Sequence, residues 1–235
     1  MRQYTNTKLI ARRARIARYA TFGGLAILVG SLVLSASAEN IPLAYLALIA
    51  GFTLAYVGST QANRFIREPR ADQALERALK GFDNKHSLYN FLLPAPHVLL
   101  TPTGLIVLLV KANDGRVLCQ QDRWTNPFRF GRLFGGMGRE PLGNPSQDAL
   151  AQINRLKQFL APKIENAALV PIDAYVVFSD PKVALQIEGA RFTTVRADAL
   201  KETLRKAKRG AALSPQLFEQ LQKSLDESAH DQTAK

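Results

Sequence analysis

Two long uncharged runs dominate the hydrophobic pattern of the first quarter of the chain. Residues 19–38 (YATFGGLAILVGSLVLSASA) contain no charged side chain, Glu39-Asn40 interrupts the run, and residues 41–59 (IPLAYLALIAGFTLAYVGS) are again uncharged. A helix needs about 20 apolar residues to cross the ~30 Å hydrocarbon core of a bilayer, and each run is long enough. The pattern therefore predicts a transmembrane helical hairpin over residues 19–59, with a very short turn.

After the hairpin the hydrophobic period changes repeatedly, which is typical of a mixed α/β domain. Helical periodicity with start and stop signals predicts helices over residues 71–82, 146–161, 197–208 and 215–228. Short apolar runs bounded by Pro and Gly turns predict strands over residues 89–93, 97–101, 105–111, 116–120, 173–179 and 191–195. The fold class is therefore α/β, with a small mixed sheet over residues 70–210. Residues 211–235 are expected to form a C-terminal helix and a disordered tail over the last seven residues.

Basic side chains mark the two ends of the hairpin. Residues 1–18 hold six Lys or Arg and no acidic residue, whereas the turn between the runs holds only Glu39. Positive residues that flank a membrane span stay in the cytoplasm, so both termini are expected there, in a multi-pass protein of the cell membrane. The basic segment 1–18 is also suited to anionic headgroups. A second alternative is a signal peptide cleaved after the small residues 36–38.

The apolar runs carry small residues at helical spacing and no ionisable group in mid-span. Ala26 with Gly30, and Ala47 with Gly51, would let helix backbones approach closely, either within the hairpin or between two copies of the chain. The lack of intramembrane charge argues against a transporter or an ion pathway. The lone Cys119 excludes an internal disulfide, and three scattered histidines offer no metal-ligand spacing.

The order of elements, together with several local motifs, resembles the NERD (nuclease-related) domain over about residues 70–205. That family is similar to restriction-endonuclease-like nucleases of the PD-(D/E)xK type. The residues that carry the resemblance are Ala71-Asp72 in the first helix, the strand pair HVLLTPTGLIVLLVK, Gly115, Trp124, the helix start Asn144-Pro145, a glutamine in that helix, and the strand at 175–178. The resemblance implies a restriction-endonuclease-like domain behind the transmembrane hairpin.

The resemblance also implies where a catalytic site would lie. In the family an Asp, and a Glu two residues before a Lys, hold a divalent metal through oxygen ligands. In this chain Pro96 and Leu109 stand at the positions of these two carboxylates. The resemblance therefore implies a vestigial site made of Asp72, His97 and Lys111, with no metal or other cofactor and no nuclease chemistry. Lys111, at a strand end, is then expected to be a solvated charge.

An alternative remains that keeps the nuclease activity. An acidic residue such as Glu76 or Asp114 would have to move into the site and hold Mg²⁺ there. The protein would then be a membrane-tethered, metal-dependent nuclease or a nucleic-acid-binding protein with a rearranged site.

Aromatic and basic side chains alternate among glycines in the loop at 125–144. Such alternation suits stacking on bases and contact with phosphates, and it suits a membrane surface equally well. A third interpretation is a connecting loop whose phenylalanines pack on the sheet. The candidate residues are Phe128, Arg129, Phe130, Arg132 and Arg139.

The sequence leads to a principal functional hypothesis of a membrane-anchored, non-catalytic NERD-like domain in the cytoplasm that acts as an interaction or scaffold module. Its expected partners are the lipid bilayer and a protein that the sequence does not identify, whereas nucleic acid is a partner mainly under the nuclease alternative.

Overall fold

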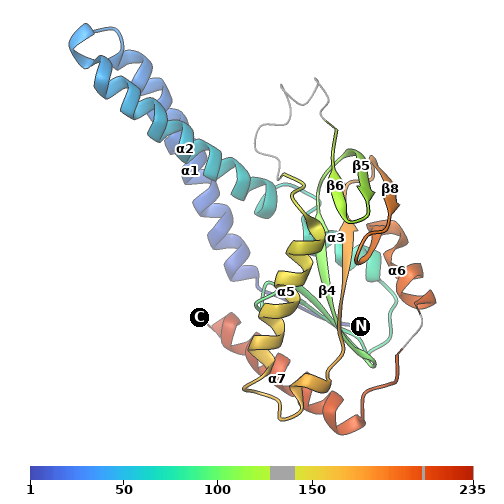
Figure 1. Cartoon of the computed structure of the whole chain (residues 1–235). Coiled ribbons are helices and arrows are strands. Elements are labelled where there is room, and N and C mark those ends of the chain that lie inside the picture. The colour runs from blue at the N-terminus through green and yellow to red at the C-terminus, as the bar shows by residue number, and fades with distance from the viewer. Residues whose placement is uncertain (128–140, 208–209, 235) are drawn as a thin grey trace. The chain divides into compact units, whose positions relative to one another are not determined.

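The computed structural model describes residues 1–127, 141–207 and 210–234, and the chain divides into two compact units. One unit combines Met1–Thr7 and Ala71–Pro127 with the chain from Pro141 onward, and the other contains Lys8–Arg70. Figure 1 shows the second unit as a pair of long helices and the first as a sheet covered by helices. An N-terminal helical pair followed by a mixed α/β domain is the predicted architecture.

The helical unit consists of α1 (Thr7–Leu34), the short η1 (Ala38–Asn40) and α2 (Ile41–Phe65). Both helices are long and apolar enough to cross a membrane, and only 17% of the most apolar window in each is buried. Among the described residues, every exposed large hydrophobic side chain except Leu169 lies on these two helices. This exposure distinguishes them from core helices of a soluble protein, which bury their apolar faces.

Small residues spaced seven apart form the seam between α1 and α2. The buried positions include Ala17, Gly24 and Ser31 on α1, and they include Ala44, Gly51 and Gly58 on α2. A Cβ atom added to Gly24 would lie 2.4 Å from the backbone nitrogen of Ala55, and one added to Gly58 would lie 2.4 Å from that of Thr21. The two backbones therefore touch directly, as small residues at a helix interface permit.

Packing within the hairpin, one of the two interpretations of the small residues, holds for Gly51 on α2 but not for Ala26 and Gly30 on α1. Gly51 packs against Gly24 and Leu28, as expected for a small residue at the interface. Ala26 is exposed, and a Cβ atom on Gly30 would meet nothing within 4 Å. The seam follows a seven-residue period through Gly24 and Ser31, so the stripe that contains Ala26 and Gly30 faces away from α2.

The soluble unit is built on a mixed six-stranded sheet in the order β1-β2-β3-β4-β7-β9. Strands β2, β3 and β4 pair antiparallel, whereas β1 with β2, β4 with β7, and β7 with β9 pair in parallel. The strands are β1 (Arg2–Thr5), β2 (Ser87–Asn90), β3 (His97–Thr101), β4 (Gly104–Lys111), β7 (Ile172–Phe178) and β9 (Thr193–Arg196). A second sheet has the order β6-β5-β8, from β5 (Gly115–Gln120), β6 (Arg123–Thr125) and β8 (Val183–Glu188).

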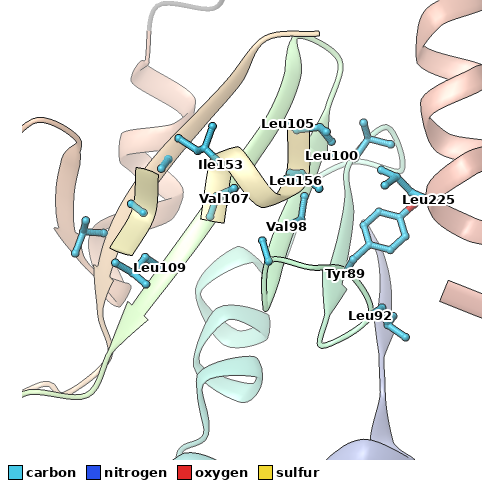
Figure 2. Packing of buried hydrophobic residues seen from close by; sticks show 14 of the residues in the cluster. Tyr89, Leu92, Val98, Leu100, Leu105, Val107, Leu109, Ile153, Leu156 and Leu225 are labelled. Carbon is cyan, nitrogen blue, oxygen red and sulfur yellow. The ribbon is translucent and has the colours of Figure 1, made fainter. Parts of the chain in front are cut away.

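Two pairs of helices cover the two faces of the main sheet. Helices α5 (Pro145–Leu160) and α7 (Pro215–Ala234) bury their apolar stripes in the larger core, and η2 (Ala167–Leu169) follows α5. Helices α3 (Ala71–Leu79) and α6 (Ala197–Lys206) cover the smaller core. Figure 2 shows the larger core, with Ile153 and Leu156 of α5 against Val107 of β4, and Leu225 of α7 near Tyr89. Because strand side chains alternate, odd-numbered residues of β4 face α5 and even-numbered ones face α3.

Several elements differ from the sequence prediction, and β2 begins two residues earlier and ends three residues earlier than the predicted range of 89–93. The N-terminal segment, expected to be only a basic flank, contributes β1, which joins the sheet beside β2. The prediction lacks strands β6 and β8. Strand β6 has only three residues, whereas β8 went unrecognised although apolar side chains alternate with polar or small ones along Val183–Glu188. The tail, expected to be disordered, continues α7 to Ala234, since Leu225 and Ala229 remain buried against the core.

Candidate functional site

The site that the resemblance implies lies at the end of β4, on the face covered by α5. Leu109, which the resemblance places at the position of a family carboxylate, is only 7% exposed. It belongs to the same buried cluster as Ile153 of α5 and Phe178 of β7. Figure 2 shows Leu109 at the end of this cluster nearest the tip of β4. Apolar packing therefore occupies the place where the family would hold a metal.

Lys111, two residues further on, points to the same face and is 4% exposed. Its Nζ donates to Oδ2 of Asp148 at 2.8 Å, and the Asp148 side chain is 45% exposed. Asp148 lies in the first turn of α5, which Asn144 caps by accepting from the Gln147 amide at 3.1 Å. The prediction of a solvated charge is wrong, because strand alternation turns Lys111 inward and α5 supplies a carboxylate for its ammonium group.

His97 is held by a chain of polar side chains across three strands. Its Nδ1 lies 2.8 Å from Oδ1 of Asn90 on β2, and Asn90 Nδ2 donates to Thr5 Oγ1 on β1 at 3.1 Å. The ring of Phe91 contacts the imidazole edge-on, with the ring centroids 4.8 Å apart. His97 is 4% exposed and shares its sheet face with Leu99. These contacts connect the N-terminal strand to the middle of the sheet.

The predicted vestigial residues do not gather on one face of the sheet. Asp72, 4% exposed, is on α3, and His97 faces the α3 side, whereas Lys111 faces α5. Within residues 1–127, 141–207 and 210–234, no group of three His, Cys, Asp or Glu side chains is arranged to hold a metal ion. A hard cation such as Mg²⁺ needs several oxygen ligands, and neither Pro96 nor Leu109 offers a side-chain oxygen. The described residues therefore do not fit a divalent metal site of the family's kind.

Sequence reasoning missed a polar cluster centred on Asp122, in the turn between β5 and β6. Asp122 accepts hydrogen bonds from Ser146 Oγ, from Trp124 Nε1 at 3.2 Å and from the Arg191 amide at 3.3 Å. Burial raises the pKa of Asp122, but these donors favour the carboxylate more strongly and leave the pKa below its ordinary value. The cluster ties the small sheet to the start of α5, two residues before Asp148.

Little in the sequence could have identified this cluster. Asp122 has a φ of 62°, and its neighbour Gln121 has a φ of 47°, so two non-glycine residues form the tight turn. Such a turn normally shows itself through Asn-Gly or Asp-Gly, and neither pair occurs here. The partner Ser146 lies 24 residues away in the sequence.

The aromatic and basic loop candidates lie outside the described residues. Phe128, Arg129, Phe130, Arg132 and Arg139 all fall within residues 128–140. The hypothesis that they contact nucleic acid or a lipid surface stays a prediction.

The chain was compared with models of protein families. Residues 64–179 match the family model described as NERD, the nuclease-related domain. The match includes α3, the strands β2 to β7 and the α5–β4 site, and it agrees with the resemblance seen in the sequence. Neither the curated proteins nor the solved structures contain a match to the chain.

Proposed function

Because the chain carries a nuclease-related domain over residues 64–179, we propose that it is a membrane-anchored, non-catalytic protein of this family. Its domain acts as an interaction or scaffold module at the cytoplasmic face of the cell membrane. The partners of this module are the lipid bilayer and a protein that remains to be identified.

The burial of Leu109 is the observation that carries the proposal. A carboxylate at this position would have to hold a cation inside an apolar cluster, where an uncompensated charge is strongly disfavoured. Instead the chain places a leucine there, in contact with a continuous core. The position contributes to the packing of the domain rather than to metal chemistry.

The pairing of Lys111 supports the same conclusion. In the family pattern the lysine acts on an attacking water, which requires an ammonium group that is available to the reacting atoms. Here the ammonium group donates to Asp148, a carboxylate supplied by α5. This arrangement stabilises the junction of strand and helix and directs the positive charge toward the protein itself.

The membrane anchor is supported by the two exposed apolar helices and by the pairing of β1. Residues Arg2–Thr5 precede α1 and pair with Ser87–Asn90, which follow α2. If both helices span a bilayer, the two ends of the hairpin must therefore lie on the same side as the domain. The basic residues in segment 1–18 favour the cytoplasmic side.

A nuclease assay on the full chain tests the proposal. The full chain is required because residues 2–5 form a strand of the domain's own sheet. We expect purified protein in mild detergent to cleave single- and double-stranded DNA and RNA no faster with Mg²⁺ or Mn²⁺ than with a chelator. The Lys111→Ala variant should behave like the wild type.

The matched control is Lys157→Ala, which removes an exposed lysine from α5. Metal-dependent cleavage that disappears in Lys111→Ala but persists in Lys157→Ala would overturn the proposal. That result would favour the alternative, a membrane-tethered nuclease with a rearranged Mg²⁺ site.

A further inference from the structure

A cavity of about 540 Å³ opens between β1 and α3, on the face of the sheet opposite to Lys111. Its walls include Gln3 from β1, Gln73, Glu76 and Arg77 from α3, and Lys80 and Gly81 just after α3. Its volume is within the range of roughly 300–1,000 Å³ that is usual for small-molecule sites. Nothing in the family resemblance assigns a role to it.

The local structure explains why polar groups converge in this cavity. Side chains of β1 alternate, so Tyr4 stacks on Tyr89 on the α5–α7 face, with ring centroids 5.2 Å apart, while Gln3 faces the α3 side. Helix α3 buries Leu75 and Leu79 against the sheet. Its polar residues at 73, 76 and 77, with Lys80 just after it, follow helical spacing and form one stripe beside β1.

The charge of the cavity is predominantly positive. Arg77 and Lys80 are exposed, and no hydrogen bond or ion pair within the described chain engages either cationic group. Two further cations from α6 reach the rim, where Lys201 Nζ donates to the Lys80 carbonyl and Arg205 Nη2 donates to the Gly81 carbonyl at 3.4 Å. Glu76 is the one carboxylate among the residues that line the cavity. Two cationic side chains and one carboxylate line the cavity, and the cations of Lys201 and Arg205 bind the adjoining backbone, so the local field favours anions.

We propose that this cavity binds a phosphate group carried by a small molecule or by a lipid headgroup. The guanidinium of Arg77 can donate two parallel hydrogen bonds to phosphate oxygens, and the ammonium of Lys80 can donate another. The amide group of Gln3 is a neutral donor at the same opening. Glu76 is an acceptor suited to a hydroxyl group on the moiety that carries the phosphate. The site does not depend on whether the domain is catalytic.

Inorganic phosphate is the probe for the first experiment. The full chain is reconstituted in nanodiscs of pure phosphatidylcholine and titrated with phosphate by calorimetry, at an ionic strength balanced with chloride. We expect saturable binding of one phosphate per chain. Replacing both cations, in the variant Arg77→Gln/Lys80→Gln, should raise the Kd by roughly tenfold or more, since hydrogen bonds to charged groups are lost.

The matched control is the variant Arg155→Gln/Lys157→Gln, which removes the same charge from exposed positions on α5. Its Kd for phosphate should equal that of the wild type. All four side chains are exposed, so both variants should keep the wild-type thermal unfolding curve. A Glu76→Gln variant should bind phosphate more tightly, because it removes the one negative charge that opposes the ligand.

Lipid composition distinguishes the two sources of the phosphate group. In nanodiscs that contain phosphatidic acid, a lipid headgroup that occupies the site would weaken the binding of added phosphate. Nanodiscs with phosphatidylglycerol carry a similar negative charge without a phosphomonoester, and they control for surface potential. Equal phosphate affinity in these two anionic nanodiscs identifies a soluble ligand, and weaker affinity with phosphatidic acid identifies the lipid.

Two results would overturn the proposal. One is the absence of saturable phosphate binding in phosphatidylcholine nanodiscs. The other is an equal loss of affinity in the Arg77/Lys80 variant and in the Arg155/Lys157 control, which would show attraction by net charge alone.

Discussion

Lys111 shows how the surroundings of one residue decide what its side chain can do. A lysine with 4% exposure is stable in a protein interior only with a hydrogen-bonded partner, and Asp148 provides one at 2.8 Å. Replacing such a pair by apolar residues is often neutral, whereas removing one partner leaves the other charge uncompensated. The pair joins α5 to β4, and its net contribution to stability is expected to be small.

Asp122 is a second single residue with a structural role, because its carboxylate connects three segments of the chain. It accepts from Ser146, Trp124 and the amide of Arg191, which belong to α5, β6 and the loop before β9. Its lowered pKa means that the folded protein holds the ionised form more strongly than the unfolded chain does. The stabilisation is therefore present above the unfolded pKa and is lost as the pH falls through the folded pKa.

We predict that Asp122→Asn lowers the free energy of unfolding at pH 7 by about 1–3 kcal/mol, because hydrogen bonds to a charged acceptor are weakened. The difference between wild type and variant should shrink as the pH falls below about 4, where the wild-type carboxylate becomes protonated. Urea unfolding in mild detergent, followed by the fluorescence of Trp124, the single tryptophan of the chain, measures this difference in the free energy of unfolding. An exposed carboxylate change, Glu165→Gln, is the control and should have little effect at either pH.

The pH dependence is the decisive part of this experiment. A difference between wild type and Asp122→Asn that stays constant from pH 7 to pH 3 would show that the carboxylate is not the stabilising group.

Among the elements, β1 shows most clearly what the sequence could not reveal. Four residues, Arg2–Thr5, carry no apolar alternation, and their partner strand begins 85 residues later, at Ser87. The strand is specified by non-local contacts: Tyr4 stacks on Tyr89, and Thr5 accepts from Asn90. Strand preference depends on neighbours as much as on composition, so a short edge strand gives little local signal.

The longer elements were predictable because their own periodicity specifies them. The hairpin of β3 and β4 and the helix α5 occur within one residue of the predicted ranges. For the site, the placement of Pro96 and Leu109 at the family's carboxylate positions stays a prediction. The sequence did not reveal the environment of Lys111, because Asp148 lies 37 residues away and meets it only through the packing of α5 on β4.

The seam between α1 and α2 leads to a prediction about helix packing. We expect Gly24→Leu to destabilise the hairpin strongly, because even a Cβ atom would lie 2.4 Å from the backbone of Ala55. Gly30→Leu should be neutral or slightly stabilising, since that position has open space and glycine is about 1 kcal/mol worse than good helix formers within a helix. Thermal unfolding of the two variants in mild detergent measures the difference.

Gly30→Leu is a close control, since it makes the same substitution on the same helix, six residues away. Equal stability of the two variants would show that α1 and α2 do not meet along the Gly24 seam.

At the scale of the whole molecule, β1 and the helical hairpin constrain each other. Strand β1 ends at Thr5 and α1 begins at Thr7, so a single residue joins the sheet to the first long helix. The chain leaves α2 at Phe65 and enters α3 at Ala71. The domain is therefore attached to the hairpin at both ends, and the N-terminal strand cannot cross to the other side of a bilayer without leaving the sheet.

This double attachment predicts the topology of the protein in cells. In a Cys119→Ser background, we expect Ser37→Cys, in the turn between the helices, to react with a membrane-impermeant maleimide in intact cells. Lys157→Cys, on the exposed face of α5, should react only after the membrane is permeabilised if, as proposed, the basic ends of the hairpin keep the domain on the cytoplasmic side. If Lys157→Cys were labelled in intact cells, the domain would lie on the outer side of the membrane, opposite to the proposed orientation. If the two helices span the membrane, the turn between them must lie on the side opposite to the sheet that contains β1. Labelling of both positions only after permeabilisation would therefore show that the helices do not span the membrane.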